Sequence, residues 1–265
     1  MSGKFGNLPG PGPGRRKGGK NKITRLLKDA ILEAAESAGD NEGLVGYLAV
    51  QAVKNPVAFM ALLGKVLPLQ IANAEGESLP IPVFRALEEV GETVTLVHVD
   101  AHLDWREEVN GEPNGYSSPI RRASEMDWIG PIVQIGMRGI GSARRGEVED
   151  AKAYGCDIID AYEIHEIGMK AVLDRIPDGG PYYLTVDADG IDPTIMPAVM
   201  GQTPGGLDWL QLRQLVHGLV NKGRVLGMDI VEIAPSRDVG RITMEYAERL
   251  ICNFIGATVR AGYYD

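Results

Sequence analysis

The sequence predicts an α/β protein with a parallel sheet, and three observations support this class. From Ser78 onward, short runs rich in β-branched and aromatic residues alternate with amphipathic helical patterns, as in βαβ units. The run Thr93–Val99 (TVTLVHV) has the composition of a buried strand. The chain has 265 residues, of which 44% are hydrophobic, so it can bury a substantial core.

The individual elements follow from hydrophobic periodicity and from the Gly, Pro and Asn residues that interrupt it. Strands are expected at 94–99, 132–137, 157–160, 182–186 and 225–233. Helices are expected at 80–90, 118–126, 144–154, 163–175, 208–221 and 241–256. In such a sheet a ligand site lies beyond the carboxyl ends of the strands.

The first 72 residues have a different composition. Residues 1–28 carry eight Lys or Arg and no acid, although the whole chain has a net charge of -9. We expect a disordered basic arm over residues 1–22, because this Gly- and Pro-rich segment cannot bury enough apolar surface. A small helical region with patterns near 23–38, 43–54 and 56–67 should follow over residues 23–72, before an α/β domain at 73–265. A cytoplasmic location is expected, since neither a membrane span nor a signal peptide is evident.

Clusters of metal-ligating side chains follow two of the predicted strands. Asp100, His102 and Asp104 come directly after the first strand, and Asp187 and Asp189 follow the run YYLTV. Alternation along an extended chain sends every second side chain to the same side, so each cluster converges. Carboxylates with an imidazole suit Mn²⁺, and a metal pair with a bridging water would provide a hydrolytic nucleophile. The alternative is that these aspartates only cap the segments that follow them, as Asp often does.

The same residues carry a family resemblance. The runs Val99–Asp104 (VDAHLD) and Thr185–Pro193 (TVDADGIDP) resemble two signature motifs of the ureohydrolases, the arginases and agmatinases. The resemblance extends from about Ser78 to the C-terminus through QIGMRG, TPGG and GMDIVEIAP. It implies an arginase-like three-layer αβα fold, a homo-oligomer, and a Mn²⁺ pair that hydrolyses a guanidino group to urea and an amine.

Roles for single residues come from this resemblance. Asp100 and Asp187 would bridge two Mn²⁺ ions, Asp104 would bind one ion, and His102 with Asp189 would bind the other. Glu232 would hold the substrate guanidinium, with which a carboxylate pairs well. Asn110 resembles a substrate-binding position of agmatinase-type enzymes, which favours agmatine or a guanidino acid over arginine.

The sequence departs from the family pattern at three places. Glu77 stands where the family has its first metal-binding histidine, so it is either a substitute ligand or a solvated loop residue. The position of the family's proton-shuttling histidine is occupied by Tyr116 or by one of Ser117 and Ser118, and of these Tyr116 would have to relay the proton. The long N-terminal section of the family is absent, so the sheet is expected to be truncated; residues 1–70 instead resemble small basic helical domains of phage-related proteins.

Three functions therefore compete. The first is a ureohydrolase of the agmatinase type with two Mn²⁺ ions. One of these ions would be lost if nothing replaces the missing histidine ligand. The second is a metal-binding pseudoenzyme without activity. The third is a nucleic-acid-associated protein that binds through residues 1–28, because clustered positive charge gives salt-dependent binding without sequence preference.

Overall fold

The computed structural model describes residues 77–264 together with residues 37–38, 47, 50 and 54. The chain divides into two compact units, Met1–Val66 and Leu67–Asp265. The expected basic arm lies outside the described residues, as does nearly all of the three expected N-terminal helices. The domain boundaries at 22 and 72 therefore stay predictions, and only the second unit is described below.

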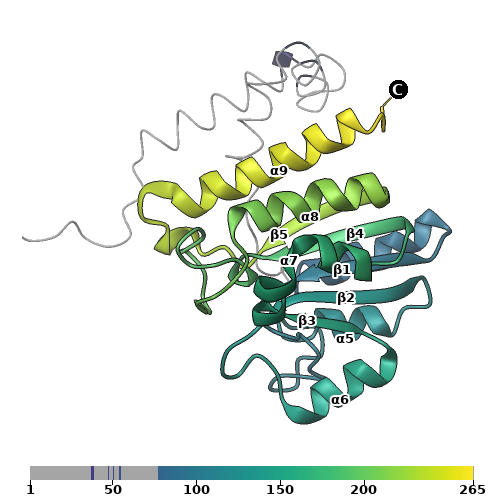
Figure 1. The fold of residues 1–265 in the computed structure, drawn as a ribbon, viewed down its shortest axis with the longest axis vertical. Helices are drawn as coiled ribbons and strands as arrows, with labels where there is room; N and C mark the ends of the chain where they lie inside the picture. Colours follow the sequence, from purple (N-terminus) through teal and green to yellow (C-terminus); the bar gives the residue numbers. More distant parts are fainter. Residues whose placement is uncertain (1–36, 39–46, 48–49, 51–53, 55–76, 265) are drawn as a thin grey trace, which may run out of the picture. The chain divides into compact units, whose positions relative to one another are not determined.

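A five-stranded parallel sheet forms the centre of this unit, in the order β3-β2-β1-β4-β5 (Figure 1). The strands are β1 (Val94–Val99), β2 (Ile129–Met137), β3 (Asp157–Asp160), β4 (Gly179–Asp187) and β5 (Gly223–Val231). The chain leaves β1 toward β2 and β3 on one side and later returns to β4 and β5 on the other. The β1 and β4 ends therefore flank the switch point of the sheet, where parallel α/β folds bind ligands.

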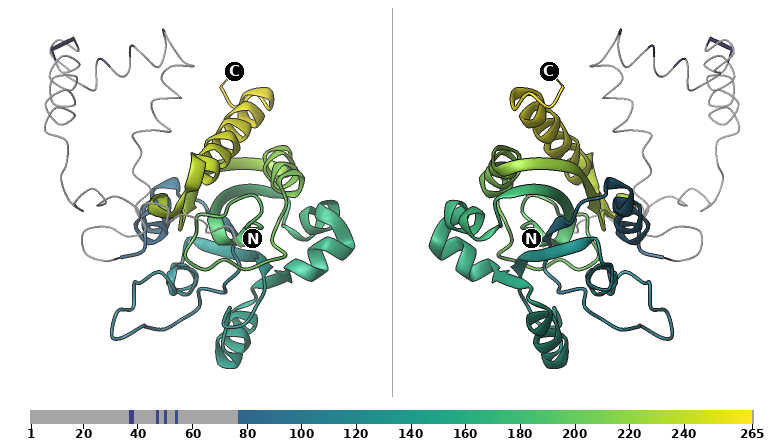
Figure 2. Two further views of the ribbon diagram at one scale, coloured as in Figure 1. Left: turned by 90° about the vertical axis from the view of Figure 1, so that its left-hand side faces the viewer. Right: turned by 90° about the vertical axis from the view of Figure 1, so that its right-hand side faces the viewer.

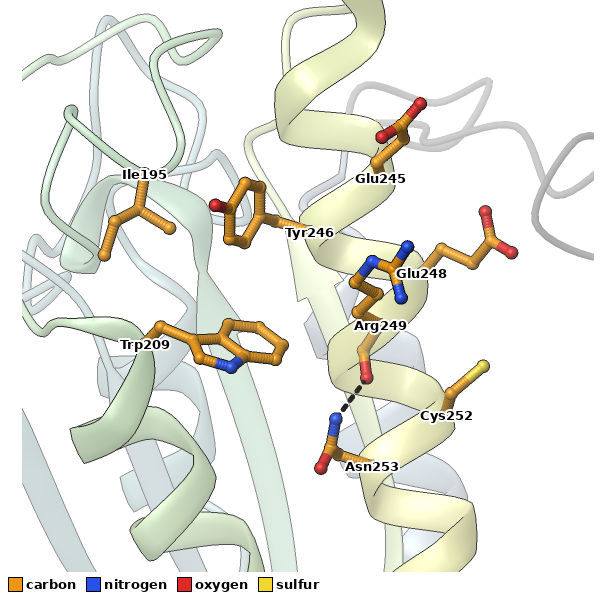
Figure 3. Close-up of a pocket in the computed structure, with 8 residues that line it drawn as sticks. All are labelled: Ile195, Trp209, Glu245, Tyr246, Glu248, Arg249, Cys252 and Asn253. Carbon is orange, nitrogen blue, oxygen red and sulfur yellow. Dashed lines mark hydrogen bonds between the residues drawn. The ribbon is translucent and has the colours of Figure 1, made fainter.

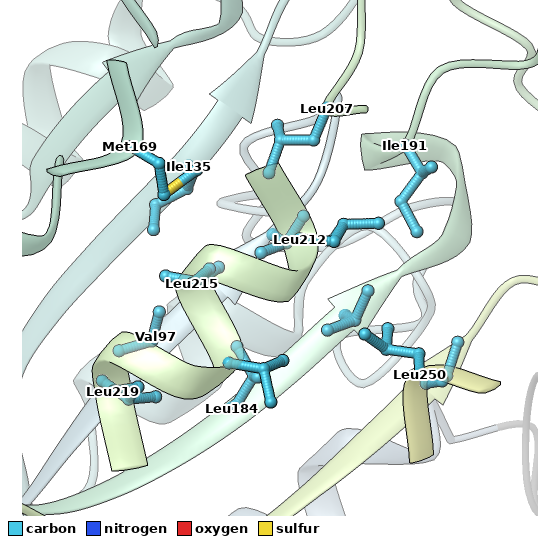
Figure 4. Packing of buried hydrophobic residues seen from close by; sticks show 14 of the residues in the cluster. Val97, Ile135, Met169, Leu184, Ile191, Leu207, Leu212, Leu215, Leu219 and Leu250 are labelled. Carbon is cyan, nitrogen blue, oxygen red and sulfur yellow. The ribbon is translucent and has the colours of Figure 1, made fainter. Parts of the chain in front are cut away.

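Helices cover both faces of the sheet, as the two views of Figure 2 show. One face packs against α7 (Ala161–Arg175), α8 (Trp209–Lys222) and α9 (Ile242–Arg260). Figure 4 shows this core, where Leu212, Leu215 and Leu219 of α8 meet Val97 and Leu184 of the sheet. The other face packs against α4 (Pro80–Ala86), the 3-10 turn η2 (Leu87–Val90), α5 (Pro119–Ser124) and α6 (Arg145–Tyr154). The predicted three-layer α/β class is confirmed.

The observed elements follow the predicted ones closely, and the differences have local causes. The strand β2 starts at Ile129 rather than 132, because Pro131 falls where the β1 register is irregular and a ladder N–H is not required. The strand β5 ends at Val231, two residues early, where Glu232 adopts a positive φ of 59°. Among the described residues, no helix is long and apolar enough to cross a membrane.

Candidate metal centre

The ends of β1 and β4 have the same local geometry. Oδ1 of Asp100 accepts a hydrogen bond from the backbone N–H of His102 at 2.7 Å, and Oδ1 of Asp187 accepts one from Asp189 at 2.8 Å. Such Asx turns reverse the chain immediately after each strand. The second ligand of each pair is thereby directed back toward the first, and the two turns face each other across the switch point of the sheet.

Two groups of side chains lie close enough to hold a metal ion. The first contains Asp100, His102 and Asp189, and the second contains His98, Asp100 and Asp104. In the first group, Nδ1 of His102 lies 3.3 Å from Oδ1 of Asp100 and 3.1 Å from Oδ2 of Asp189. Asp100 belongs to both groups, as a carboxylate that bridges two ions would.

Burial makes this cluster electrostatically unfavourable without a cation. Desolvation raises the pKa of Asp104 and Asp187 well above the ordinary value, and the neighbouring carboxylates raise both further. Burial would also raise the pKa of Asp100, but contacts with His102 and His98 outweigh it and hold that pKa below its ordinary value. Contacts with Asp100 and Asp189 raise the pKa of His102 to about 11. In the metal-free site, protons therefore neutralise charge that a bound metal cation would otherwise neutralise.

One buried oxygen supports the same conclusion. Oδ2 of Asp100 is inaccessible to solvent and makes no well-aligned hydrogen bond, although Nε2 of His98 lies 3.1 Å away. A buried carboxylate oxygen without a full hydrogen bond is costly, and a bound cation would offset that cost. The donor set of carboxylates and imidazoles matches a hard or borderline ion such as Mn²⁺.

A cavity of about 280 Å³ opens beside this cluster. Its lining includes His102, Asp104, Asp187, Asp189, Tyr116 and Glu232. Asp104 and Glu232 have φ angles of 51° and 59°, an unusual conformation for residues other than glycine. Burial raises the pKa of Glu232 to about 7, with the charges of Asp189 and Asp100 adding to the effect. A cationic ligand in the cavity would therefore meet a set of carboxylates.

The remaining predicted site residues lie in different surroundings. Tyr116 lines the cavity and is 63% exposed. The Glu77 carboxylate lies 2.6 Å from Nη1 of Arg85, so it is engaged in an ion pair. Asn110 is exposed, in the turn closed by hydrogen bonds between Val109 and Glu112, and does not line the cavity. The metal role of Glu77 and the substrate role of Asn110 remain predictions.

Arg138 is a structural residue that sequence reasoning missed. Its guanidinium is nearly buried and donates to the backbone carbonyls of Gly136, Asp189, Gly190, Ile191, Thr203 and Pro204. It thereby ties the end of β2 to η3 (Ala188–Gly190) and to the loop that continues from Met200 and Gly201 at the cavity. The signal in the sequence was an arginine directly after an apolar strand, within QIGMRG.

Gly190 sets the distance between the two Asx turns of the candidate metal centre. A Cβ at this position would lie 2.7 Å from the backbone N and 2.8 Å from the Cα of Asp100. We expect Gly190→Ala to push η3 away from β1, lowering the free energy of unfolding by about 1–3 kcal/mol and weakening metal binding. Chemical denaturation and a Mn²⁺ titration measure the two effects. Gly146→Ala in α6 is the control, because a Cβ added there would meet no atom within 4 Å outside its own helical turn. Equal effects of both variants would contradict the expectation.

A second, larger cavity shares no lining residue with the metal centre. It has a volume of about 840 Å³ and lies between Trp209 at the start of α8 and the Tyr246 to Asn253 face of α9 (Figure 3). Its side chains include Glu245, Glu248, Arg249 and Cys252. None of its lining residues belongs to either group of candidate metal ligands.

Comparison with known proteins places this geometry in a family. Residues 76–256 match the arginase family, and the chain therefore belongs to that family. It is 37% identical over 185 residues to guanidinopropionase of Pseudomonas aeruginosa, covering 67% of this chain and 56% of that protein. It is 35% identical over 171 residues to agmatinase of Bacillus subtilis, covering 64% and 57%.

Solved structures agree with the sequence comparison. The chain resembles proclavaminate amidino hydrolase from Streptomyces clavuligerus with a TM-score of 0.62 and 28% identity, over 69% of this chain and 62% of that one. The agmatine ureohydrolase of Thermoplasma volcanium gives a TM-score of 0.60 and 33% identity, over 71% and 61%. The match to the curated relatives named here spans little more than half of their length.

Proposed function

We propose that this protein hydrolyses the guanidino group of a small molecule to urea and an amine, with two Mn²⁺ ions bound at the ends of β1 and β4. The observation that carries the proposal is the group of Asp100, His102 and Asp189, which lie close enough to hold an ion, with Asp104 close to Asp100 on its other side in the second group. Similarity to a guanidinopropionase and to agmatinases supports the guanidino substrate. The names of those relatives describe their own substrates, so the substrate of this chain is part of the proposal.

The donor types present suit such a metal pair, although Asp187 belongs to neither of the two ligand groups. Asp100 and Asp187 would bridge the ions, Asp104 would bind one of them, and His102 with Asp189 would bind the other. Glu77 is the remaining proposed ligand, and its Oε1 is engaged by Arg85. When bound, the ions would lower the pKa of water and supply the hydroxide nucleophile for hydrolysis.

The chain itself would bind and orient the substrate. The Glu232 carboxylate faces the cavity from the end of β5, where it can pair with the planar guanidinium. That cation would favour the ionised form of Glu232, whose pKa burial has raised to about 7. Tyr116 is the candidate to protonate the departing amine, because it lines the same cavity and is largely exposed. Asn110 could contact the substrate chain only if its turn moves toward the cavity.

Urea release from guanidino compounds tests the proposal. The full chain, saturated with Mn²⁺, should release urea from agmatine, 3-guanidinopropionate or 4-guanidinobutyrate faster than from arginine. Glu232→Gln should raise KM by at least about tenfold, because it removes a charged hydrogen-bond partner of the guanidinium. Metal content and urea should be measured on the same sample, with the oligomeric state taken from light scattering.

The matched control is Glu248→Gln, a change of the same kind at an exposed glutamate on α9 outside the metal centre. It should leave KM unchanged. Two bound Mn²⁺ ions with no urea from any of the four compounds would exclude the hydrolase and leave a metal-binding protein without activity. Failure to bind Mn²⁺ would exclude both the hydrolase and the inactive metal-binding protein.

A further inference from the structure

A row of polar side chains crosses the centre of the sheet, one pleat below the metal-binding turns. Gln134 of β2, His98 of β1, Thr185 of β4 and Asp229 of β5 are register partners on successive neighbouring strands. His98 precedes Asp100 by two residues, so both side chains leave β1 on the same side. His98 and Gln134 are only 3% and 2% exposed. Polar groups buried this deeply within an apolar sheet need an explanation.

Hydrogen bonds around Gln134 determine which nitrogen of His98 carries the hydrogen. Nε2 of Gln134 lies 2.7 Å from the carbonyl oxygen of Leu103 and 3.3 Å from Nδ1 of His98. A carbonyl oxygen can only accept, so the Gln134 atom facing it is the donating amide nitrogen. Its second N–H then faces Nδ1 of His98, which must accept. An accepting Nδ1 has no hydrogen, and the ring hydrogen is therefore on Nε2.

The Nε2 atom of His98 faces the shared carboxylate. It lies 3.1 Å from Oδ2 of Asp100, with side chains 4% and 1% exposed. The contact is not an in-line hydrogen bond, since Oδ2 has no hydrogen-bond partner. The Nε2–H dipole is therefore close enough to attract this oxygen, and a carboxylate oxygen has a second lone pair with which it can bind a cation. That arrangement fixes the orientation of a bridging carboxylate and leaves the oxygen available to a cation.

We propose that His98 is a positioning residue of the metal centre: Leu103 and Gln134 fix its Nε2–H tautomer, and this N–H holds the Asp100 carboxylate in its bridging orientation. The proposal rests on the proposed function, because it assigns a role within the same site. Since His98, Asp100 and Asp104 also form a possible ligand group, the rival is that His98 binds the metal directly. A ligating Nε2 needs a free lone pair, so its hydrogen would have to be on Nδ1, opposite the N–H of Gln134.

The tautomer can be measured without metal. In the metal-free protein labelled with ¹⁵N-histidine, NMR at pH 8 should show the His98 signals of an imidazole with hydrogen on Nε2 and a bare Nδ1. Gln134→Met removes the donor to Nδ1, and we expect a detectable population of the other tautomer in that variant. Hydrogen on Nδ1 in the unaltered protein would overturn the proposal. This result does not depend on catalysis or on Mn²⁺ binding, so it remains decisive if the proposed function fails.

Measurements of Mn²⁺ affinity distinguish a positioning role of His98 from direct ligation of the metal by His98. His98→Leu should weaken Mn²⁺ binding by about 10–100-fold, the usual range for lost outer-shell partners, while two ions still bind at saturation. His98→Gln offers an amide N–H near the position of Nε2 and should restore affinity to within about threefold of the unaltered protein. His217→Leu is the control, because His217 contacts Asn253 and Arg260 and belongs to neither ligand group. Loss of one whole ion in His98→Leu, or no effect of that change, would overturn the proposal.

Discussion

Asp187→Asn is expected to have opposite effects on stability and on metal binding. Burial and the charges of Asp100, Asp189 and Glu232 raise the pKa of Asp187, so its ionised form is unfavourable in the metal-free fold. The Asn side chain keeps the oxygen that accepts the Asp189 N–H but carries no charge. The free energy of unfolding of the metal-free protein should rise by about 1–3 kcal/mol at pH 8, whereas urea release should fall by about 10³-fold or more. Denaturant unfolding in EDTA and urea assays measure the two effects.

Asp192→Asn is the matched control, because it lies shortly after η3 on the same segment of chain and involves the same change of atoms. Partial burial would raise the pKa of Asp192, but hydrogen bonds from Thr194, Gly205 and Gly206 outweigh it and lower that pKa. Its Oδ2 accepts from Gly205 N–H at 2.8 Å. The ionised carboxylate is therefore favoured in the folded state, and its replacement should lower stability. If both variants moved the metal-free stability in the same direction, the charge argument for Asp187 would fail.

The positions of the two acidic turns of the candidate metal centre could be predicted from sequence because they depend on strand ends. An apolar run followed by Asp-X-His or Asp-X-Asp places acids at the carboxyl edge of a parallel sheet, whatever the strand order. The structure adds that β1 and β4 are neighbours, which brings Asp100 and Asp189 to the same imidazole. Strand order depends on which helices cover which face, and no local pattern specifies it.

His98 and Arg138 show what a linear reading misses. His98 sits within an apolar strand run, where the linear sequence alone indicates only a buried position. Its relation to Gln134 depends on the register of β1 against β2, which pairs residues 36 positions apart. The acceptors of Arg138 extend to residues up to 66 positions away. Contacts of this range depend on tertiary packing, so they become visible only once the sheet is assembled.

The stability of the metal-free protein is expected to fall as the pH rises from 5 to 8. The pKa of Glu232 is raised from 4.5 to about 7, and burial raises the pKa values of Asp104, Asp187 and Asp189. Raised carboxyl pKa values mean that the folded state binds more protons than the unfolded state in this window, so stability decreases with pH. His102 acts in the same direction above its ordinary value of 6.5, since its pKa is raised to about 11. Asp100, whose pKa is lowered, changes stability only at lower pH.

Mn²⁺ should reverse this dependence, because metal binding displaces the protons that the folded site retains. The increase in unfolding free energy on adding saturating Mn²⁺ should grow from pH 5 to pH 8, by about 2–4 kcal/mol in total. Denaturant curves at four pH values, with Mn²⁺ or EDTA, measure it. Glu232→Gln should flatten the metal-free curve between pH 5 and 7, because the variant lacks the group that titrates there. A metal-free protein that gained stability toward pH 8 would show that the site carboxylates are already compensated by the fold, and a cation would then not be needed to explain them.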